Sequence, residues 1–344
     1  MKTMRTKNQS LLTAVGICLL QLAFNFHTSS ASAAPISYAG YAVKPKLIVV
    51  IVIDQFRADY LTRFPEKFLS ATGPKTSVGG FRYLMSNGAY FPMAKFDFLQ
   101  NMTCPGHAAI MTGSSPSRTH IPLNEWIDRE SSKRRYCVAD DVDGLSPRQL
   151  QGTTVGDEIK NTGAPSRSVS LALKDRAAIL LGGHRSDISF WIDKGAWTSS
   201  NYYGKKLPVW LASENERLKK DLDKDYVWGA QKAKRGALES YALPYGAEIT
   251  TDAAIAALRG AGLGKSGTTD VLTLSYSTHD ILGHAVGPNA QEMESLTIAE
   301  DKEIARLLNA IKAEVPGGLK TVGHRPDRRS RRGSDDRLSE GEQN

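Results

Sequence analysis

Three stretches of the chain are continuous runs of apolar and β-branched residues, without the alternation typical of a strand exposed on one face. They are KPKLIVVIVIDQF (44–56), SRSVSLALKDR (166–176) and TTDVLTLSYSTHD (268–280). Runs of this kind are typical of strands buried on both faces of a sheet. We therefore expect three buried strands with charged residues near their carboxyl ends.

Segments with helical periodicity alternate with these runs. Residues 251–263 and 291–313 have it, and the second segment is followed by a Pro-Gly-Gly sequence that would end a helix. Strands that alternate with helices predict an α/β fold with a mostly parallel sheet covered by helices on both faces. Residues 182–245, rich in Trp, Tyr, Lys and Asp and without clear periodicity, are expected to form a cap insertion over the sheet.

The amino terminus has the pattern of a secretory signal peptide. Basic residues precede an apolar run at 11–24, which is followed by small residues ending in ASAA. The apolar run is too short for a comfortable membrane span. We expect a signal peptide at residues 1–33, a mature chain that is periplasmic or secreted, and no stable membrane span after cleavage.

The formal charge of +8 does not indicate nucleic-acid binding. Part of the excess lies in the signal peptide, and the arginines near the end of the chain have acidic neighbours. The sequence has no basic helix and no platform of aromatic and basic residues, so nucleic acid is not expected as a surface partner. Cys104 and Cys137 remain after signal cleavage, and whether they pair is left open.

Charged residues follow each of the three buried runs. Asp54 ends the first, Lys174 and Arg176 the second, and Asp280 the third. One Asp after a strand is usually a turn residue. Here three strands are followed by charged residues at one edge of the sheet. Because ligands of α/β proteins bind at that edge, the pattern instead predicts a ligand-binding site. Lys174 and Arg176 are separated by one residue, so in an extended segment both would point towards phosphoryl oxygens.

The stretch NMTCPGHAAIMTG (101–113) places Thr103 at the start of an expected helix. A threonine there is either a cap for the first backbone N–H groups or a nucleophile beside an anion that those groups hold. The cap is the more common role of such a threonine. The decision between the two depends on the rest of the chain.

Two further patterns suit metal binding and phosphate binding. Asp280 and His284 are four residues apart, on one helical face or one tight loop, and both are good zinc ligands. The alternative is a solvated Asp that caps a turn beside an exposed His. Asp54 could bind a second cation with Thr103 as its alkoxide ligand, and the Asn124 amide could bind a phosphoryl oxygen. Together these groups suit phosphoryl transfer.

Five ordered elements resemble the alkaline phosphatase superfamily. They are the strand ending in Asp54, TCPGHA at 103–108, NEW at 124–126, KDR at 174–176 and SxxDxxGHxxGP at 277–288. The chain is most similar to the branch with type I phosphodiesterases and nucleotide pyrophosphatases, and within it to the phosphate-irrepressible, threonine-using alkaline phosphatases. The resemblance runs from about residue 44 to about residue 322 and implies an alkaline-phosphatase-like fold.

The resemblance implies a role for each matching residue. It implies that Thr103 is the nucleophile that becomes phosphorylated. It also implies that Thr103 and Asp54 are ligands of the zinc ion that activates the Thr103 hydroxyl. Asp280 and His284 become ligands of the other zinc, so two zinc ions are the expected cofactors. The phosphate-binding residues are implied to be Asn124, Lys174 and Arg176, and the Lys-x-Arg pair favours monoesters over diesters. His107 is interpreted as structural, and His279 as an exposed neighbour.

The chain departs from the family after residue 322. Relatives continue with a strand ending in an Asp-His pair and with a later histidine, which complete the two zinc sites, whereas residues 323–344 form a charged sequence without apolar pattern. Residues Gly323 to Arg332 can be encoded by codons that give Val-Ile-Ala-Leu-Thr-Ala-Asp-His-Gly when the DNA is read one base later. We therefore expect a frameshift after Val322, an incomplete catalytic domain at 34–322 and a disordered tail at 323–344.

The expected function is a zinc-dependent phosphate monoester hydrolase that acts on a small phosphate ester through a phosphothreonine, impaired in this chain by the incomplete ligand set. Two alternatives remain open. One is a phosphodiesterase or nucleotide pyrophosphatase, against which the Lys174 and Arg176 pair argues. The other is an inactive, non-catalytic exported remnant, which the zinc content of the purified chain would distinguish from an enzyme.

Overall fold

The computed structural model describes residues 44–204 and 206–323. The predicted signal peptide (1–33) and, apart from Gly323, the predicted tail (323–344) lie outside the described residues. No helix in the described part of the chain is both long enough and apolar enough to cross a membrane.

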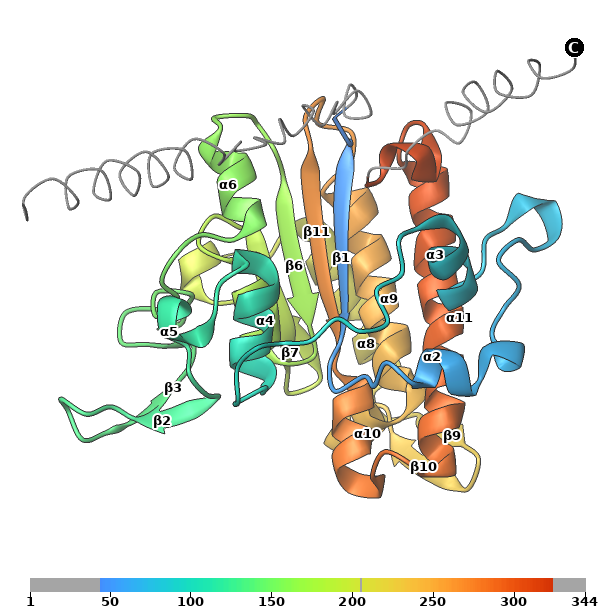
Figure 1. Cartoon of the computed structure of the whole chain (residues 1–344), viewed down its shortest axis with the longest axis horizontal. Helices are drawn as coiled ribbons and strands as arrows, with labels where there is room; N and C mark the ends of the chain where they lie inside the picture. The colour runs from blue at the N-terminus through green and yellow to red at the C-terminus, as the bar shows by residue number, and fades with distance from the viewer. Residues whose placement is uncertain (1–43, 205, 324–344) are drawn as a thin grey trace, which may run out of the picture. The chain divides into compact units, whose positions relative to one another are not determined.

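A five-stranded sheet forms the centre of the described fold (Figure 1). Its strand order is β1 (Leu47–Ile53), β11 (Asp270–Tyr276), β6 (Ser168–Ala172), β7 (Ile188–Asp193) and β8 (Ala196–Thr198). All neighbouring pairs are parallel except β7 with β8, which is antiparallel. The predicted mostly parallel α/β sheet is thus confirmed.

Helices cover both faces of this sheet, because alternate side chains of the central strands enter two different apolar clusters. Val169 and Leu171 of β6 pack into the cluster that contains α9, whereas Ala172 packs into the cluster of α4 and α7. The α-helices are α2 (Tyr60–Arg63), α3 (Phe81–Asn87), α4 (Thr103–Thr112), α5 (Pro116–Thr119), α6 (Val155–Asn161), α7 (Asp175–Gly182), α8 (Val209–Lys219), α9 (Pro244–Gly260), α10 (Thr278–Val286) and α11 (Gln291–Glu314). The helix predicted at 291–313 is confirmed.

Small hairpins and short 3-10 helices make up the remaining elements. The hairpins are β2 (Glu125–Ile127) with β3 (Arg134–Tyr136), β4 (Ala139–Asp140) with β5 (Gly144–Leu145), and β9 (Asp225–Trp228) with β10 (Gln231–Lys234). The 3-10 helices are η2 (Pro65–Lys67), η3 (Pro74–Thr76), η4 (Asn201–Tyr203), η5 (Leu238–Ala242) and η6 (Gly318–Thr321). Within the expected cap insertion at 182–245, β7 and β8 belong to the central sheet rather than to a separate cap.

The burial of the three predicted strands differs. Every residue of β6 and β11 is buried, as expected. In β1 only Leu47 is buried and the other residues are half-buried, so the prediction that this strand is buried on both faces was wrong. The physical reason is its position, because β1 is the last strand of the sheet on its side.

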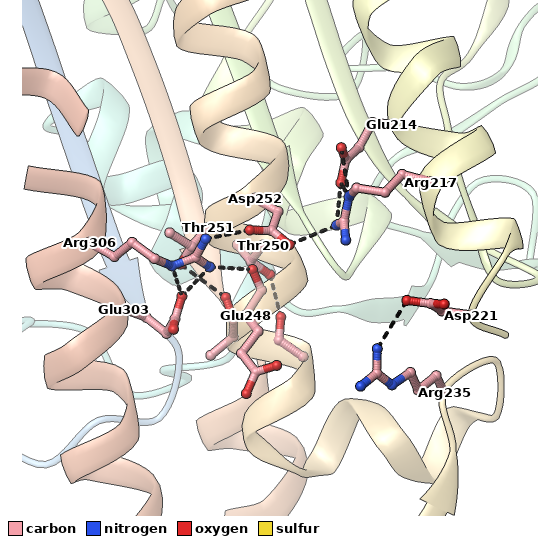
Figure 2. A network of polar contacts seen from close by, with 12 residues as sticks. Glu214, Arg217, Asp221, Arg235, Glu248, Thr250, Thr251, Asp252, Glu303 and Arg306 are labelled. Atoms are coloured by element: carbon pink, nitrogen blue, oxygen red, sulfur yellow. Dashed lines mark hydrogen bonds and ion pairs between the residues drawn. The ribbon is translucent and has the colours of Figure 1, made fainter. Parts of the chain in front are cut away.

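A chain of ion pairs connects three helices on the α9 side of the molecule (Figure 2). Asp252 of α9 accepts hydrogen bonds from Arg217 of α8 and from Arg306 of α11. Arg217 also binds Glu214, and Arg306 also binds Glu303. Both arginines and Asp252 are partly exposed, so each pair contributes little by itself, but the shared carboxylate of Asp252 fixes how α8 and α11 lie against α9.

Candidate active site

Four chain segments bring polar side chains together at the carboxyl edge of the sheet. Asp54 directly follows β1, and Lys174 lies between β6 and α7. Thr103 is the first residue of α4, and Asp280 lies in the first turn of α10, which follows β11. The edge at which the sequence predicted a site therefore does gather these side chains.

Thr103 points at Asp54. Its Oγ1 donates a hydrogen bond of 3.0 Å to Asp54 Oδ2, and the residue is buried. The N-cap of α4 is Met102, and no side chain caps this helix end. The capping role considered for Thr103 is therefore not observed, because the hydroxyl bonds to the carboxylate instead.

Lys174 bridges two carboxylates. Its Nζ donates a hydrogen bond of 2.8 Å to Asp54 Oδ2 and a second hydrogen bond to Asp280 Oδ2. The three side chains are only 11–13% exposed. One nearly buried ammonium group thus lies in direct contact with two nearly buried carboxylates.

The pKa of Asp54 is lower than its ordinary value. Burial is the largest influence and raises this pKa, whereas charge at His107 and Lys174 and hydrogen bonds from Lys174 and Thr103 lower it. Burial lowers the pKa of His107, so its ring is neutral near pH 7 and Lys174 is the cation that acts on Asp54 there.

His107 holds the start of α4 against β11. Its ring nitrogens lie 2.8 Å from the Thr103 carbonyl oxygen and 2.9 Å from Ser275 Oγ, and the ring is buried. The prediction that this histidine is structural is confirmed. It anchors the backbone of the candidate nucleophile to a strand of the sheet.

Asp280 and His284 lie on one face of α10, as their spacing predicted. His284 Nε2 is 3.3 Å from Asp280 Oδ1. The imidazole is 70% exposed, and its Nε2 also lies 3.4 Å from Gln55 Nε2. His284 is therefore the accessible member of the cluster, whereas Asp280 is turned inward to Lys174.

Asn124 and a disulfide support the segment around Thr103. Asn124 Oδ1 accepts a hydrogen bond of 2.9 Å from the Cys104 N–H, one of the backbone groups expected to hold an anion. Cys104 and Cys137 form a disulfide that closes a separation of 33 residues. The pairing that the sequence left open is thus present, and it ties α4 to the segment after β3.

Arg176 does not share the orientation of Lys174. The prediction that both point the same way assumed an extended segment, but α7 begins at Asp175 and places Arg176 in its first turn. Its Nη1 contacts the Tyr136 hydroxyl at 3.3 Å, and that hydroxyl donates to Asp175 Oδ1. Arg176 is thus held beside Tyr136 rather than in the cluster of Asp54, Thr103 and Lys174.

His279 is buried, so its interpretation as an exposed neighbour was wrong. Neither His279 nor Glu300 of α11 is exposed, and His279 Nδ1 lies 2.9 Å from Glu300 Oε2. The rings of Phe56 and Tyr60 pack against the imidazole. This contact fixes α10, and with it Asp280, against α11.

Comparison with known proteins assigns this chain to a family. Residues 48–317 match the family described as type I phosphodiesterase / nucleotide pyrophosphatase. The chain belongs to this family.

Two relatives and one crystal structure to which this chain is similar are alkaline phosphatases. Alkaline phosphatase PafA of Elizabethkingia meningoseptica is 31% identical over 331 residues, which cover 80% of this chain and 58% of the relative. Alkaline phosphatase PhoV of Synechococcus elongatus is 32% identical over 341 residues, which cover 86% of this chain and 60% of the relative. The crystal structure of wild-type alkaline phosphatase PafA superposes with a TM-score of 0.71 at 30% identity. The match covers 79% of this chain and 60% of the PafA chain. The chain therefore has an alkaline-phosphatase-like fold and spans about 60% of these relatives' length.

The resemblance implies two zinc ions, for which the sequence offered two candidate pairs of donors. Asp54 with Thr103 and Asp280 with His284 are the candidate pairs. In the described ranges 44–204 and 206–323, no group of three His, Cys, Asp or Glu side chains is placed to hold a metal ion. A catalytic zinc site uses three protein ligands. The described donors thus do not complete either site.

Some contributors to the site carry no sequence signal of their own. Gln55, beside His284, has φ of +61°, a backbone conformation that a non-glycine residue rarely adopts. This strained turn directs the chain away from β1 immediately after Asp54. Tyr136 and Glu300 contact site segments from far along the sequence, so local patterns could not reveal them.

Proposed function

We propose that this chain derives from phosphate monoester hydrolases of the alkaline phosphatase type, with Thr103 as the nucleophile. The observation that carries the proposal is the position of Thr103 Oγ1, which is buried at the start of α4 and hydrogen-bonded to Asp54 beside Lys174. Family membership and the similarity to several alkaline phosphatases support it.

The proposed reaction has two steps. The Thr103 oxygen forms a bond to phosphorus while the bond between phosphorus and the ester oxygen breaks, and the alcohol leaves. Water then hydrolyses the phosphothreonine and releases inorganic phosphate. In the first step the Asp54 carboxylate orients the Thr103 hydroxyl, whose proton ends on the departing alcohol, and Lys174 compensates negative charge. Zinc would supply activation of the hydroxyl and of water, but because its donor set is incomplete here we derive no step through it.

The test of the nucleophile compares single substitutions in one helix. Thr103→Ala should lower hydrolysis of an aryl phosphate by at least roughly 1000-fold, towards background, because it removes the attacking oxygen. Thr112→Ala is the matched control, because the Thr112 hydroxyl bonds to the Ala108 carbonyl and the Ser114 N–H at the other end of the same helix. Full activity in the Thr103→Ala protein would overturn the assignment.

A second measurement applies even if turnover of this chain is very slow. The protein is incubated with an aryl phosphate, quenched in acid and digested, and its peptides are weighed by mass spectrometry. Phosphate on the peptide that contains Thr103 supports the proposal. Phosphate at another residue contradicts it, and a chain that acquires none while showing no turnover is the non-catalytic remnant.

Phosphodiester hydrolysis is the second candidate, because the family description names phosphodiesterases. The rates on an aryl phosphate and on the bis-aryl diester distinguish the two. We expect the monoester to react faster, since Lys174 supplies positive charge beside Thr103 for the additional anionic oxygen. Lys174→Ala should reduce this preference, and an unchanged ratio would contradict the proposed role of Lys174.

The site of action is proposed to be outside the cytoplasm. The support is the amino-terminal pattern of basic, apolar and then small residues. Fusing residues 1–40 to a reporter that is active only after export should yield an active reporter, and loss of its activity when the apolar run is interrupted by charges would identify the signal.

A further inference from the structure

A cavity of about 530 Å³ lies at the carboxyl edge of the sheet. Residues 173–175, which follow β6, and residues 191–193 at the end of the neighbouring strand β7 contribute to its lining. Residues 143–145, which end the hairpin of β4 with β5, and residues 198–200 supply the rest. Because ligands of α/β proteins bind beyond the carboxyl ends of parallel strands, the cavity lies where a ligand is expected.

Lys174 connects this cavity to the candidate nucleophile. The residue lines the cavity, and its Nζ donates a hydrogen bond of 2.8 Å to Asp54 Oδ2. The same carboxylate oxygen accepts the hydrogen bond from Thr103 Oγ1. The cavity is therefore next to the place where the proposed reaction puts the phosphoryl group, and it is positioned to hold the organic part of a phosphate ester.

Hydrogen-bond acceptors dominate the polar lining of the cavity. Asp143, Asp175 and Asp193 all contribute to it. Arg148 donates to Oδ2 of Asp143, and the Tyr136 hydroxyl donates to Oδ1 of Asp175. The second carboxylate oxygen of each residue, and both oxygens of Asp193, accept no hydrogen bond from any residue in the described part of the chain. A ligand that fits this lining is therefore rich in donors.

Ser200 adds an independent sign that a ligand group is missing. The residue lines the cavity and is only 8% exposed. Its Oγ is buried and has no hydrogen-bond partner among residues 44–204 and 206–323. A buried hydroxyl without a partner is costly, and a ligand hydroxyl would supply that partner. The adjacent Ser199 Oγ donates to the Ser189 carbonyl at 2.7 Å, so its lone pairs remain to accept a bond.

The charges around the cavity distinguish between two kinds of donor-rich ligand, one with hydroxyl groups and one with an ammonium group. Asp143 lies 2.9 Å from Arg148, and Asp175 lies 4.0 Å from Arg176. Asp193 forms no ion pair with any described residue, but it is exposed, where attraction to a cation is weak. The cavity thus combines many acceptors with little uncompensated buried charge, which favours several neutral hydroxyl groups.

We propose that this cavity binds the alcohol portion of a polyhydroxylated phosphate monoester, namely a monosaccharide phosphate, whose phosphate lies at Thr103. Asp193 and Ser200 are the residues that select for hydroxyl groups. The volume of the cavity falls within the range of small-ligand pockets, about 300–1,000 Å³. The inference rests on the proposed function for the position of the phosphate, and it adds the class of substrate.

The test measures binding rather than turnover. Glucose 6-phosphate, n-hexyl phosphate and 6-aminohexyl phosphate are titrated into the full chain in a calorimeter, and again into the Thr103→Ala full chain so that hydrolysis contributes no heat. We expect glucose 6-phosphate to bind at least about tenfold more tightly than n-hexyl phosphate, which has the same number of carbons but no hydroxyl groups. Equal binding of these two, or no binding of glucose 6-phosphate, would overturn the proposal. Tightest binding of 6-aminohexyl phosphate would assign the cavity to a cation and overturn it too.

A carboxylate substitution locates the binding in the cavity. Asp193→Ala should raise the Kd of glucose 6-phosphate at least about fivefold and leave that of n-hexyl phosphate unchanged, because only the sugar donates hydrogen bonds to the carboxylate. Asp223→Ala is the matched control. Asp223 is also exposed and without an ion pair to any described residue, and it does not line the cavity.

A hydroxyl substitution separates ligand binding from folding. Ser200→Ala should weaken glucose 6-phosphate at least about threefold without lowering the urea concentration at which the chain unfolds, because the Ser200 Oγ makes no hydrogen bond to lose within the described ranges. Ser213→Ala is the control, because the exposed Ser213 hydroxyl bonds to the Val209 carbonyl of its own helix. Unchanged affinity for glucose 6-phosphate in both Asp193→Ala and Ser200→Ala would reject the proposal.

These outcomes are distinct from a failure of the proposed hydrolase function. If Thr103→Ala keeps full activity on an aryl phosphate, Thr103 is not the nucleophile, yet selective binding of glucose 6-phosphate that depends on Asp193 still supports the cavity as a sugar site. If phosphate is found on Thr103 but glucose 6-phosphate and n-hexyl phosphate bind equally, the hydrolase proposal stands and the inference about the cavity is wrong.

Discussion

At the scale of single residues, Lys174 determines the electrostatics of the candidate site. Its ammonium group contacts Asp54 and Asp280, which come from segments that follow two neighbouring strands. Without this cation the two carboxylates would be nearly buried and would lack their main partner. Lys174 thus has a structural role in addition to the substrate role that its sequence position suggests.

We predict that Lys174→Ala lowers the free energy of unfolding by about 2–4 kcal/mol, because removing one partner leaves nearly buried charges uncompensated. Urea denaturation of the parent and the variant measures this. Lys67→Ala is the control, because the Lys67 and Glu294 pair is much more exposed and should cost less than about 1 kcal/mol. Equal losses in the two variants would show that burial does not decide the effect.

At the scale of elements, the start of α4 is held by His107, Asn124 and the disulfide between Cys104 and Cys137. These contacts come from β11, from the residue before β2 and from the segment after β3. Because they converge on the first turn of α4, they fix Thr103 more firmly than the helix could by itself.

The disulfide should contribute about 3–4 kcal/mol, because it closes a loop of 33 residues in the unfolded chain. We expect the Cys104→Ser/Cys137→Ser double variant to unfold at correspondingly lower urea concentration, and the parent to behave like it in excess dithiothreitol. If dithiothreitol does not change the urea concentration at which the parent unfolds, and no free cysteine thiols are detected after the treatment, the reagent does not reach the disulfide.

Helix α3 depends on a carboxylate from α11. Asp301 accepts hydrogen bonds from the Leu69 N–H at 2.7 Å and the Phe81 N–H at 2.6 Å. A Cβ on Gly80 would lie 2.1 Å from the Asp301 carbonyl oxygen, so only glycine permits this approach of the two helices. Asp301 thereby satisfies donors that the start of α3 leaves free.

Asp301→Asn should lower stability by about 1–3 kcal/mol, because an amide oxygen cannot serve both donors as well as a carboxylate. Burial raises the pKa of Asp301 above its ordinary value despite the two hydrogen bonds. The folded state therefore binds this proton more readily than the unfolded state, and acidification through that window favours folding. The deficit of the variant should thus grow as the pH falls from neutral towards the ordinary pKa of an aspartate, and a constant deficit would contradict the raised pKa.

At the scale of the whole molecule, the candidate nucleophile Thr103 is buried beside Asp54, whereas the described residues contain no group of three His, Cys, Asp or Glu side chains placed to hold a metal ion. Its family relatives are longer, and this chain spans about 60% of their length. The half-buried strand β1 lies on the side of the sheet where Val322 pairs with Leu47. Asp54, which directly follows β1, joins this strand to the candidate site.

We predict that the purified chain retains fewer than two zinc ions after dialysis, because pairs of donors bind zinc more weakly than sets of three or four. Elemental analysis by mass spectrometry measures this. His284→Ala should reduce whatever zinc is retained, whereas His120→Ala, a substitution of an exposed histidine away from the cluster, should not. Two tightly held ions per chain would show that further ligands complete the sites.

The candidate site was predictable where its signal is local. Asp54, Thr103 and Lys174 follow or begin elements with clear sequence patterns, and their segments meet because parallel strands end at one edge. The orientation of Arg176 was not predictable, because it depends on α7 beginning at Asp175, one residue before Arg176. The burial of His279 was not predictable either, because its partner Glu300 lies 21 residues away.

The sequence by itself determined the class of the fold, the strands β6 and β11, the helix predicted at 291–313 and the residues that end the strands. Apolar periodicity and β-branched runs act locally, so they are readable without coordinates. The tertiary structure alone decided the edge position of β1, the disulfide, the bridge that Lys174 forms between two carboxylates, and the cavity that Lys174 lines. These features result from contacts between segments far apart in the chain, whose energies depend on packing and burial that no local pattern encodes.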